Sequence, residues 1–149
     1  MPASLKDLDA LLSIENSCFK SDRVSRRQMR YLLRQGKTLT YVCKVAGKAQ
    51  GYIMCFIPAH PKPARIYSLA VLPEQRGKGI ASHLLKKSLL KLRELGYRSC
   101  RLEVRASDKK TRSLYQRFDF KQIESLPGYY EDGRDGIRMA LALQARKSK

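Results

Sequence analysis

Apolar and polar residues alternate along the chain with two different periods. Near the N-terminus, the spacing of leucines over residues 5–19 is that of an amphipathic helix, and Ser4 is placed to cap it. A second, shorter helix is expected over residues 25–34, with Gly36 ending it. The chain is therefore expected to begin with two helices.

Strand-like runs follow these helices. Residues 38–45 and 50–58 have the composition of two strands, and the turn at 46–48 is of the kind that closes a hairpin. Residues 65–71 form a third, strongly apolar run, as expected for a central strand. These three strands are the predicted start of a sheet.

The second half of the chain alternates helices with strands. A helix with an apolar stripe is expected over residues 81–95, ended by Gly96, and another over 109–118, capped by Asp108. Residues 99–105 between them alternate apolar and polar side chains, which is typical of a strand.

Two last strands flank a turn-rich segment at residues 127–136. The resulting order is ααβββαβαββ, without internal repeats. This order predicts an α+β or three-layer α/β protein built around one sheet.

Composition narrows the class of protein. The 149 residues suit a single domain over 1–149, and 43% hydrophobic with 30% charged residues is typical of a globular protein. No apolar run approaches the ~20 residues of a membrane helix, and acids within the first 21 residues interrupt any signal-peptide pattern. We therefore expect a cytoplasmic protein without membrane contact, with a basic tail at 144–149.

Four cysteines, Cys18, Cys43, Cys55 and Cys100, are widely separated and form no C-x-x-C pair. The chain has only two histidines beside them, so no metal-binding pattern is present. We expect four reduced, mostly buried thiols and no metal.

Charge is the most unusual bulk property. The 31 Lys and Arg residues against 13 Asp and Glu residues give a formal net charge of +18, which predicts anionic partners. The basic residues are scattered, without the aromatic-interleaved motif of an RNA-binding module. Sequence-specific nucleic-acid binding is therefore disfavoured. Non-specific contact with nucleic acid, contact with acidic protein and a merely solvated surface all stay open.

A glycine-rich turn separates the third strand from the next helix. Arg76, Gly79 and Ala81 have the spacing R-x-x-G-x-A, with an additional Gly77. Glycines allow a tight turn, and the amides and dipole of a helix N-terminus favour a bound phosphate. The spacing fits neither a Walker loop nor a dinucleotide fingerprint. The alternative is a turn whose glycines serve only packing.

The turn resembles the acyl-CoA signature of the GNAT N-acetyltransferases, and further motifs extend the likeness over nearly the whole chain. They are Arg101-Leu-Glu-Val-Arg-Ala-Ser-Asp, Ser113-Leu-Tyr, Phe118-Asp-Phe, Pro127-Gly-Tyr-Tyr-Glu-Asp-Gly and Arg138-Met. In this combination the chain resembles the RimI-like ribosomal-protein N-terminal alanine acetyltransferases. The resemblance implies a mixed sheet of seven strands, splayed at its centre and flanked by helices on both faces, with acetyl-CoA as cosubstrate.

The resemblance also implies where acetyl-CoA binds. Main-chain groups at the end of the third strand would hold pantetheine, with the Val71 N–H near the thioester carbonyl. Amides of the glycine turn would hold the pyrophosphate, beside the positive charge of Arg76. Lys78 would either reach a phosphate or be simply solvated. The residues implied are Leu69, Ala70, Val71, Arg76, Gly77, Lys78, Gly79, Ile80, Ala81 and Asp108.

Two residues depart from the family pattern. Asp108 stands where the family usually has Asn, and it cannot donate an amide hydrogen bond to the cofactor. Asp119 replaces the usual glycine of an L-G-F turn, which predicts a left-handed backbone at that position.

Acetylation of an amine needs two proton movements. An amine that is largely protonated near neutral pH must lose a proton before attack, and the departing thiolate benefits from a proton donor. The resemblance implies Glu103 as general base, directly or through water, and Tyr115 as general acid. From the residues alone, Glu103 is equally a strand carboxylate paired with Arg101 or Arg105, and Tyr115 a side chain packed on apolar neighbours.

The acceptor would be framed by residues 18–24 and 127–136, with Tyr129 and Tyr130 walling a peptide channel. Acids in the second segment either attract an amine or belong to an ordinary hairpin. The first segment reads Phe19-Lys-Ser-Asp-Arg where the family has Phe-Pro-Trp-Ser, so a ribosomal acceptor is left open.

We therefore expect an acyltransferase that moves acetyl directly from acetyl-CoA to a peptide or protein N-terminal α-amine in a ternary complex. A lysine side chain or a small amine, such as a polyamine or aminoglycoside, is the alternative acceptor. A CoA-binding adaptor without catalysis is the alternative of a different class, and the presence of Glu103 and Tyr115 argues against it.

Overall fold

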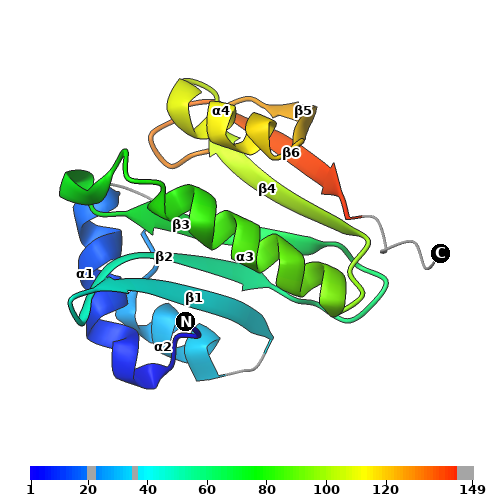
Figure 1. Ribbon diagram of the computed structural model, residues 1–149. Helices are drawn as coiled ribbons and strands as arrows, with labels where there is room; N and C mark the ends of the chain where they lie inside the picture. Colours follow the sequence, from blue (N-terminus) through cyan, green and yellow to red (C-terminus); the bar gives the residue numbers. More distant parts are fainter. Residues whose placement is uncertain (20–22, 35–36, 144–149) are drawn as a thin grey trace.

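The computed structural model describes residues 1–19, 23–34 and 37–143, and its elements follow the expected order (Figure 1). The helices are η1 Leu5–Asp7, α1 Leu8–Cys18, α2 Arg26–Arg34, η2 Pro73–Gln75, α3 Ile80–Glu94 and α4 Lys109–Arg117. The strands are β1 Thr38–Val45, β2 Lys48–Phe56, β3 Ala64–Val71, β4 Ser99–Arg105, β5 Lys121–Leu126 and β6 Gly136–Ala142. The predicted helix stop at Gly36 and the tail at 144–149 lie outside the described residues.

One mixed sheet joins the strands in the order β1-β2-β3-β4-β6-β5. Neighbouring strands are antiparallel except β3 and β4, which are parallel. The β3–β4 ladder ends where Ile66 pairs with Leu102, and beyond this point the two strands separate, as Figure 1 shows. The central splay implied by the family resemblance is therefore confirmed.

The implied count of seven strands is wrong for the described residues, which form six. A segment at the N-terminus runs beside β1 but makes only an isolated bridge between Pro2 and Tyr41. The bonds of this bridge run from the Ala3 N–H to the Thr40 carbonyl and from the Val42 N–H to the Met1 carbonyl, both at 2.9 Å. Ser4 then caps the short helix η1 in a capping box with Asp7, so the chain leaves the sheet edge before a strand can form.

Helices cover both faces of the sheet because the buried strands alternate between two apolar clusters. In β2, Tyr52 and Met54 pack into the cluster formed with α1 and α2, whereas Ile53 and Cys55 pack into the cluster formed with α3. Successive side chains of a strand point to opposite faces, so one strand serves both cores. The expectation of helices on both faces is confirmed.

Local boundaries differ from the prediction where the backbone makes a tight turn. Strand β2 begins at Lys48 rather than at residue 50, because Ala46 and Gly47 alone form the hairpin turn, with φ of 54° and 79°. Helix α3 stops before Gly96, whose φ is 87°. Asp119 has φ of 70°, which confirms the predicted left-handed position.

Within these described ranges, no helix has the length and apolar character that crossing a bilayer requires. The same residues contain no group of three or more His, Cys, Asp or Glu side chains placed to hold a metal ion. Of the four free cysteines, Cys55 and Cys100 are buried and Cys18 and Cys43 are half-buried, so the thiols are less uniformly buried than expected.

Candidate active site

A cavity of about 930 Å³ lies where β3 and β4 separate. Its walls come from the end of α1, the start of α2, the diverging strands, α4 and the segment before β6. Among the lining residues are Glu15, Leu69, Glu103, Tyr115 and Tyr130. The splay thus brings side chains from both halves of the chain to one space.

The last residues of β3 present an open edge to this space. Leu72, just after β3, donates its N–H to the carbonyl of Gln50 in β2, at 2.9 Å. Because hydrogen-bonding directions alternate along a strand, the N–H of Val71 points away from β2. The Val71 carbonyl accepts from Cys18 Sγ at 3.3 Å and Arg76 Nε at 3.1 Å. These contacts leave the Val71 N–H directed toward the side on which β4 has departed.

The glycine turn has the backbone expected of a phosphate cradle. Gly77 and Gly79 have φ of 83° and 81°, and a Cβ atom added to either would meet nothing within 4 Å. Gly79 is the N-cap of α3, so the first N–H groups of this helix lack intrahelical partners. The glycine turn lies on the surface, outside the cavity. The cavity lining includes Leu69 and Asp108 but no residue of this turn.

Arg76 and Lys78, the two cations of the turn, make different contacts. Arg76 folds back onto the Val71 carbonyl, so its guanidinium braces the end of β3. Lys78 is exposed and donates to Gln75 Oε1 at 3.2 Å. Asp108, expected as a helix cap, accepts the Thr111 N–H at 3.2 Å and also lines the cavity.

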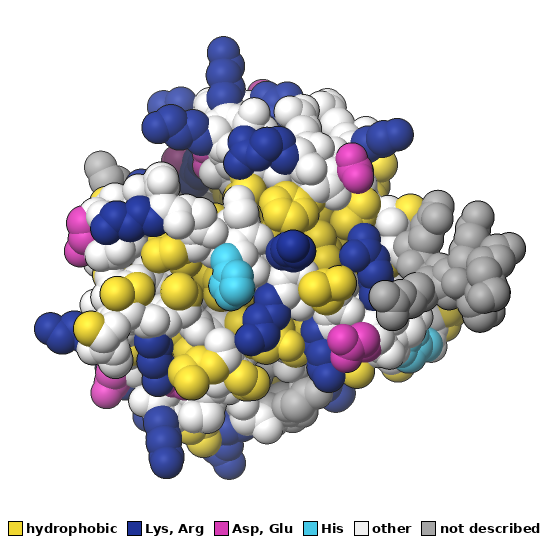
Figure 2. All heavy atoms as spheres, viewed as in Figure 1, with side chains coloured by type: hydrophobic (Ala, Val, Ile, Leu, Met, Phe, Trp, Pro, Cys, Tyr) yellow, Lys and Arg dark blue, Asp and Glu magenta, His cyan; other side chains and the backbone are white. Residues whose placement is uncertain are grey.

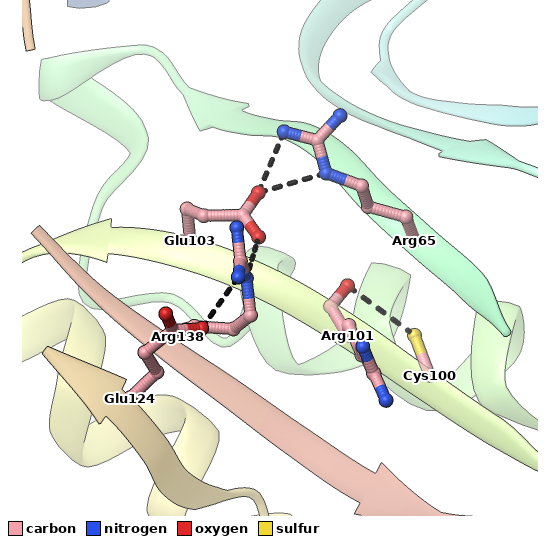
Figure 3. A network of polar contacts seen from close by, with 6 residues as sticks. All are labelled: Arg65, Cys100, Arg101, Glu103, Glu124 and Arg138. Carbon is pink, nitrogen blue, oxygen red and sulfur yellow. Dashed lines mark hydrogen bonds and ion pairs between the residues drawn. The ribbon is translucent and has the colours of Figure 1, made fainter. Parts of the chain in front are cut away.

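Glu103 is held between two arginines, neither of which neighbours it in sequence (Figure 3). Its Oε1 lies 2.6 Å from Arg65 Nη2, and its Oε2 lies 2.9 Å from Arg138 Nε. Arg138 also pairs with Glu124 at 2.6 Å. The Glu103 side chain is only 7% exposed, yet it lines the cavity. The carboxylate is therefore fixed at the point where the sheet opens.

The expectation that Glu103 pairs with Arg101 or Arg105 is wrong. The parallel register sets Arg65 opposite Arg101, two residues before Glu103, and the antiparallel register sets Arg138 directly opposite Glu103. Arg101 and Arg105 share a face of β4 with Glu103 but are displaced roughly 7 Å along the strand, whereas a residue directly opposite on a neighbouring strand is only about 5 Å away.

Tyr115 lies in α4 with its ring buried and its side chain on the cavity wall. Its ring meets Phe120 edge-on, with centroids 5.5 Å apart, so the packing role predicted from the residues alone is also present. Burial raises the pKa of the Tyr115 hydroxyl well above its ordinary value. A tyrosine hydroxyl is protonated at neutral pH even at its ordinary pKa of about 10, and burial extends this protonation to higher pH.

Tyr129 and Tyr130 both line the cavity and contact each other edge-on, with centroids 5.0 Å apart. The guanidinium of Arg105 lies 4.3 Å from the Tyr130 ring centroid and pairs with Asp132 at 2.9 Å. Asp135 accepts the Gly128 N–H at 2.9 Å. Asp135 thus bonds within its own segment, whereas Asp132 pairs with β4 and also lines the cavity. In the other acceptor segment, residues 20–22 lie outside the described part.

A buried network beneath the cavity was not anticipated from the sequence. Glu15 of α1 is 1% exposed and accepts hydrogen bonds from the Tyr52 hydroxyl, from Ser68 Oγ at 3.3 Å and from the Val24 N–H at 2.8 Å. These bonds connect α1 to β2, to β3 and to the residues that precede α2. The only signal in the sequence was an acid on the apolar side of a helix, which is rarely buried without partners.

Gly79→Ala is expected to weaken acetyl-CoA binding by about tenfold, equivalent to ~1.4 kcal/mol, because a side chain disfavours the φ of 81° and adds bulk where the backbone would approach a phosphate. Isothermal titration calorimetry with acetyl-CoA measures the change. Gly47→Ala is a matched control, since Gly47 has φ of 79° and equally open surroundings in the β1–β2 turn. Equal affinities for the two variants would contradict the assignment of the cradle.

Comparison with known proteins agrees with the family resemblance that the sequence motifs indicated. The acetyltransferase (GNAT) family model matches residues 8–120. The chain is 30% identical to an N-alpha-acetyltransferase of Sulfolobus acidocaldarius over 152 residues, which cover 95% of this chain and 90% of that protein.

Solved structures agree with this match in fold. The ribosomal-protein-S18-alanine N-acetyltransferase from Escherichia coli superimposes with a TM-score of 0.89 at 24% identity, covering 99% of this chain and 95% of its own. A chain of the NatC complex bound to Gag peptide and CoA gives a TM-score of 0.84 at 22% identity, with 97% of each chain covered. Since the family model matches most of its length, this chain belongs to the acetyltransferase (GNAT) family.

Proposed function

We propose that this protein transfers the acetyl group of acetyl-CoA to the N-terminal α-amine of a peptide or protein, at the cavity between β3 and β4. The observation that carries the proposal is that Glu103, Tyr115 and the open edge of β3 border one cavity. The GNAT family uses acetyl-CoA, and the α-amine follows from the similarity to the Sulfolobus acidocaldarius N-alpha-acetyltransferase.

Acetyl-CoA fits the residues along this edge. The free amides at the start of α3 and the glycine turn suit a pyrophosphate, because a helix N-terminus favours negative charge. Leu69 and Val71 offer main-chain groups to the pantetheine arm. The Val71 N–H, directed toward the opening, would stabilise negative charge that develops on the thioester oxygen.

Glu103 and Tyr115 would then carry the two proton transfers. Glu103 accepts a proton from the acceptor ammonium, directly or through one water, which frees the nitrogen lone pair. A bond forms between this nitrogen and the acetyl carbon as the carbon–sulfur bond breaks. Tyr115 gives its proton to the departing sulfur, and the proton lost by the acetylated amine restores neutrality to the tyrosinate through solvent. Glu103 releases its proton to solvent, so the reaction yields the amide, free CoA and one proton.

The acceptor would enter past Tyr129 and Tyr130. Their edge-on rings make a rigid apolar wall, and the contact of Arg105 with Tyr130 and Asp132 holds this wall in place. An extended peptide main chain suits such a wall. A ribosomal-protein acceptor is supported only by similarity in fold to the Escherichia coli S18 alanine acetyltransferase.

Release of free CoA thiol tests the proposal across acceptor classes. The acceptors are a peptide with a free α-amine, the same peptide with its α-amine blocked and one lysine left free, spermidine, and an aminoglycoside. We expect turnover only with the free α-amine. Preferential turnover of the blocked peptide or a small amine would make this protein a different kind of N-acetyltransferase. Tight acetyl-CoA binding without turnover on any acceptor would favour the adaptor.

A further inference from the structure

Helix α2 carries an arginine surface that acetyl transfer does not use. Its sequence, Arg-Arg-Gln-Met-Arg-Tyr-Leu-Leu-Arg, contains four arginines and no acid. At 100° per residue, Arg26, Arg27, Arg30, Arg34 and Tyr31 fall within an arc of about 140°. The opposite side of the helix holds Met29, which is fully buried. One face of α2 therefore packs on the protein, and the other carries the four arginines and Tyr31. We call this cationic face the α2 arginine surface.

This arrangement is unfavourable for an isolated helix. Arg26 with Arg30, and Arg30 with Arg34, are like charges four residues apart, which repel each other. Arg26 and Arg27 also lie in the first turn, where the helix dipole favours acids, and no acid is present there. In the part of the chain that the structure describes, Arg26 alone among the four has an ion pair, with the exposed Asp9 at 2.7 Å. Folding does not explain why the charges are gathered here.

The other exposed side chain of this surface is aromatic. Tyr31 is 58% exposed on the edge of the arginine arc. Guanidinium groups bind phosphates through paired N–H donors, and an exposed ring offers a stacking platform for an unpaired base. Carboxylates of an acidic protein would satisfy the arginines but offer no planar ring to stack on the tyrosine. The combination favours a single-stranded nucleic acid.

The basic side chains elsewhere on the surface also favour a large anionic partner. Figure 2 shows Lys and Arg side chains spread over the visible face, with few acidic ones, and the chain carries a formal charge of +18. One CoA molecule cannot require so many cations. In Figure 1, α2 lies at the lower left, and with α1 it covers the face of the sheet opposite α3. Phosphates bound at α2 would thus be distinct from those bound at the glycine turn.

We infer that the α2 arginine surface binds the phosphate backbone of single-stranded nucleic acid without reading its sequence. Val24, which precedes the helix, and Gln28, in its first turn, line the cavity. Arg27, Arg30 and Arg34 do not. The binding surface therefore begins beside the acceptor end of the cavity and stays outside it. The inference goes beyond acetyl transfer and does not depend on it.

Fluorescence anisotropy with a labelled single-stranded RNA of mixed sequence and about 20 nucleotides tests the inference. A parallel titration uses single-stranded DNA of the same length. The triple variant Arg27→Gln, Arg30→Gln, Arg34→Gln should bind at least about tenfold more weakly. Its plot of log Kd against log salt should be less steep by about 2, since each lost contact to a single strand accounts for about 0.7. The control triple Lys62→Gln, Arg98→Gln, Lys121→Gln removes the same charge from exposed sites elsewhere and should keep the wild-type slope.

A second variant tests whether bases stack on Tyr31, without changing the charge of the surface. Tyr31→Leu should weaken binding to the RNA and leave binding to inorganic polyphosphate unchanged. The arginine triple should melt no lower than the wild type, because it relieves repulsion, and should acetylate peptides at the wild-type rate. This last readout separates failure of the present inference from failure of the proposed function.

Three results would overturn the inference. The wild-type protein could show no binding to either strand at low salt. The arginine triple variant and the control triple variant could weaken binding equally, which would show that binding depends on total charge and not on α2. Polyglutamate could compete for the α2 arginine surface as well as RNA does, which would assign the surface to an acidic protein.

Discussion

Replacing Tyr115 by phenylalanine is expected to lower kcat by about 10²–10⁴-fold, the range typical of losing a general acid. The variant keeps the aromatic ring and its contact with Phe120, so the fold and the affinity for acetyl-CoA should be preserved. Raising the pH should not restore turnover, because the missing group is a proton donor to sulfur. Steady-state kinetics with one accepted peptide, with calorimetry for acetyl-CoA, measures both quantities.

Tyr97→Phe is the matched control for this variant. Tyr97 is also a buried tyrosine, but its hydroxyl bonds to the Pro58 carbonyl, away from the cavity. Its loss should lower the melting temperature and leave kcat unchanged. Near-wild-type turnover by Tyr115→Phe would remove Tyr115 from the mechanism.

Glu103→Gln is expected to lower kcat/KM near neutral pH by a similar factor of about 10²–10⁴, and the loss should shrink as pH rises. A peptide α-amine has a pKa of about 7.7–8.0, so the acceptor reaches the enzyme increasingly neutral above pH 8 and needs a base less. Measuring kcat/KM from about pH 6.5 to 9.5 gives this profile. A defect that stays constant over the range would leave Glu103 a structural or substrate-positioning role.

Glu124→Gln separates loss of the base from loss of an ion pair. Glu124 and Glu103 both pair with Arg138, at 2.6 Å and 2.9 Å, but Glu124 is 53% exposed and does not line the cavity. The pair that Glu124 makes is exposed and contributes at most about 1 kcal/mol to stability. The variant should therefore fold and turn over like the wild type at every pH. A defect equal to that of Glu103→Gln would show that Arg138 must be paired on both sides.

Local sequence signals predicted most of the elements. The strand Ser99–Arg105 has the expected bounds because its side chains alternate strictly, and Asp108 caps α4 because its carboxylate reaches the Thr111 N–H. Asp119 adopts the left-handed backbone that its place in a glycine position predicted. Each of these features depends on a few consecutive residues, which is the range over which sequence patterns determine structure.

Contacts between distant strands could not be predicted in this way. The pairing of Glu103 with Arg65 and Arg138 depends on the registers of β3, β4 and β6, which no local pattern fixes. The same holds for Glu15, whose partners Tyr52 and Ser68 come from two different strands. Arg76 was expected to add positive charge beside the phosphates, and the motif gave no sign that its guanidinium also donates to the Val71 carbonyl. The family resemblance placed residues in the site but did not supply their partners.

The position of the transferred acetyl group tests the central proposal most directly. The protein is incubated with acetyl-CoA and a peptide that has both a free α-amine and one internal lysine, and the product is fragmented by tandem mass spectrometry. The account predicts a single acetyl group on the first residue with the wild-type protein and almost none with Tyr115→Phe in the same time. Acetylation of the lysine, or equal labelling by Tyr115→Phe, would contradict it.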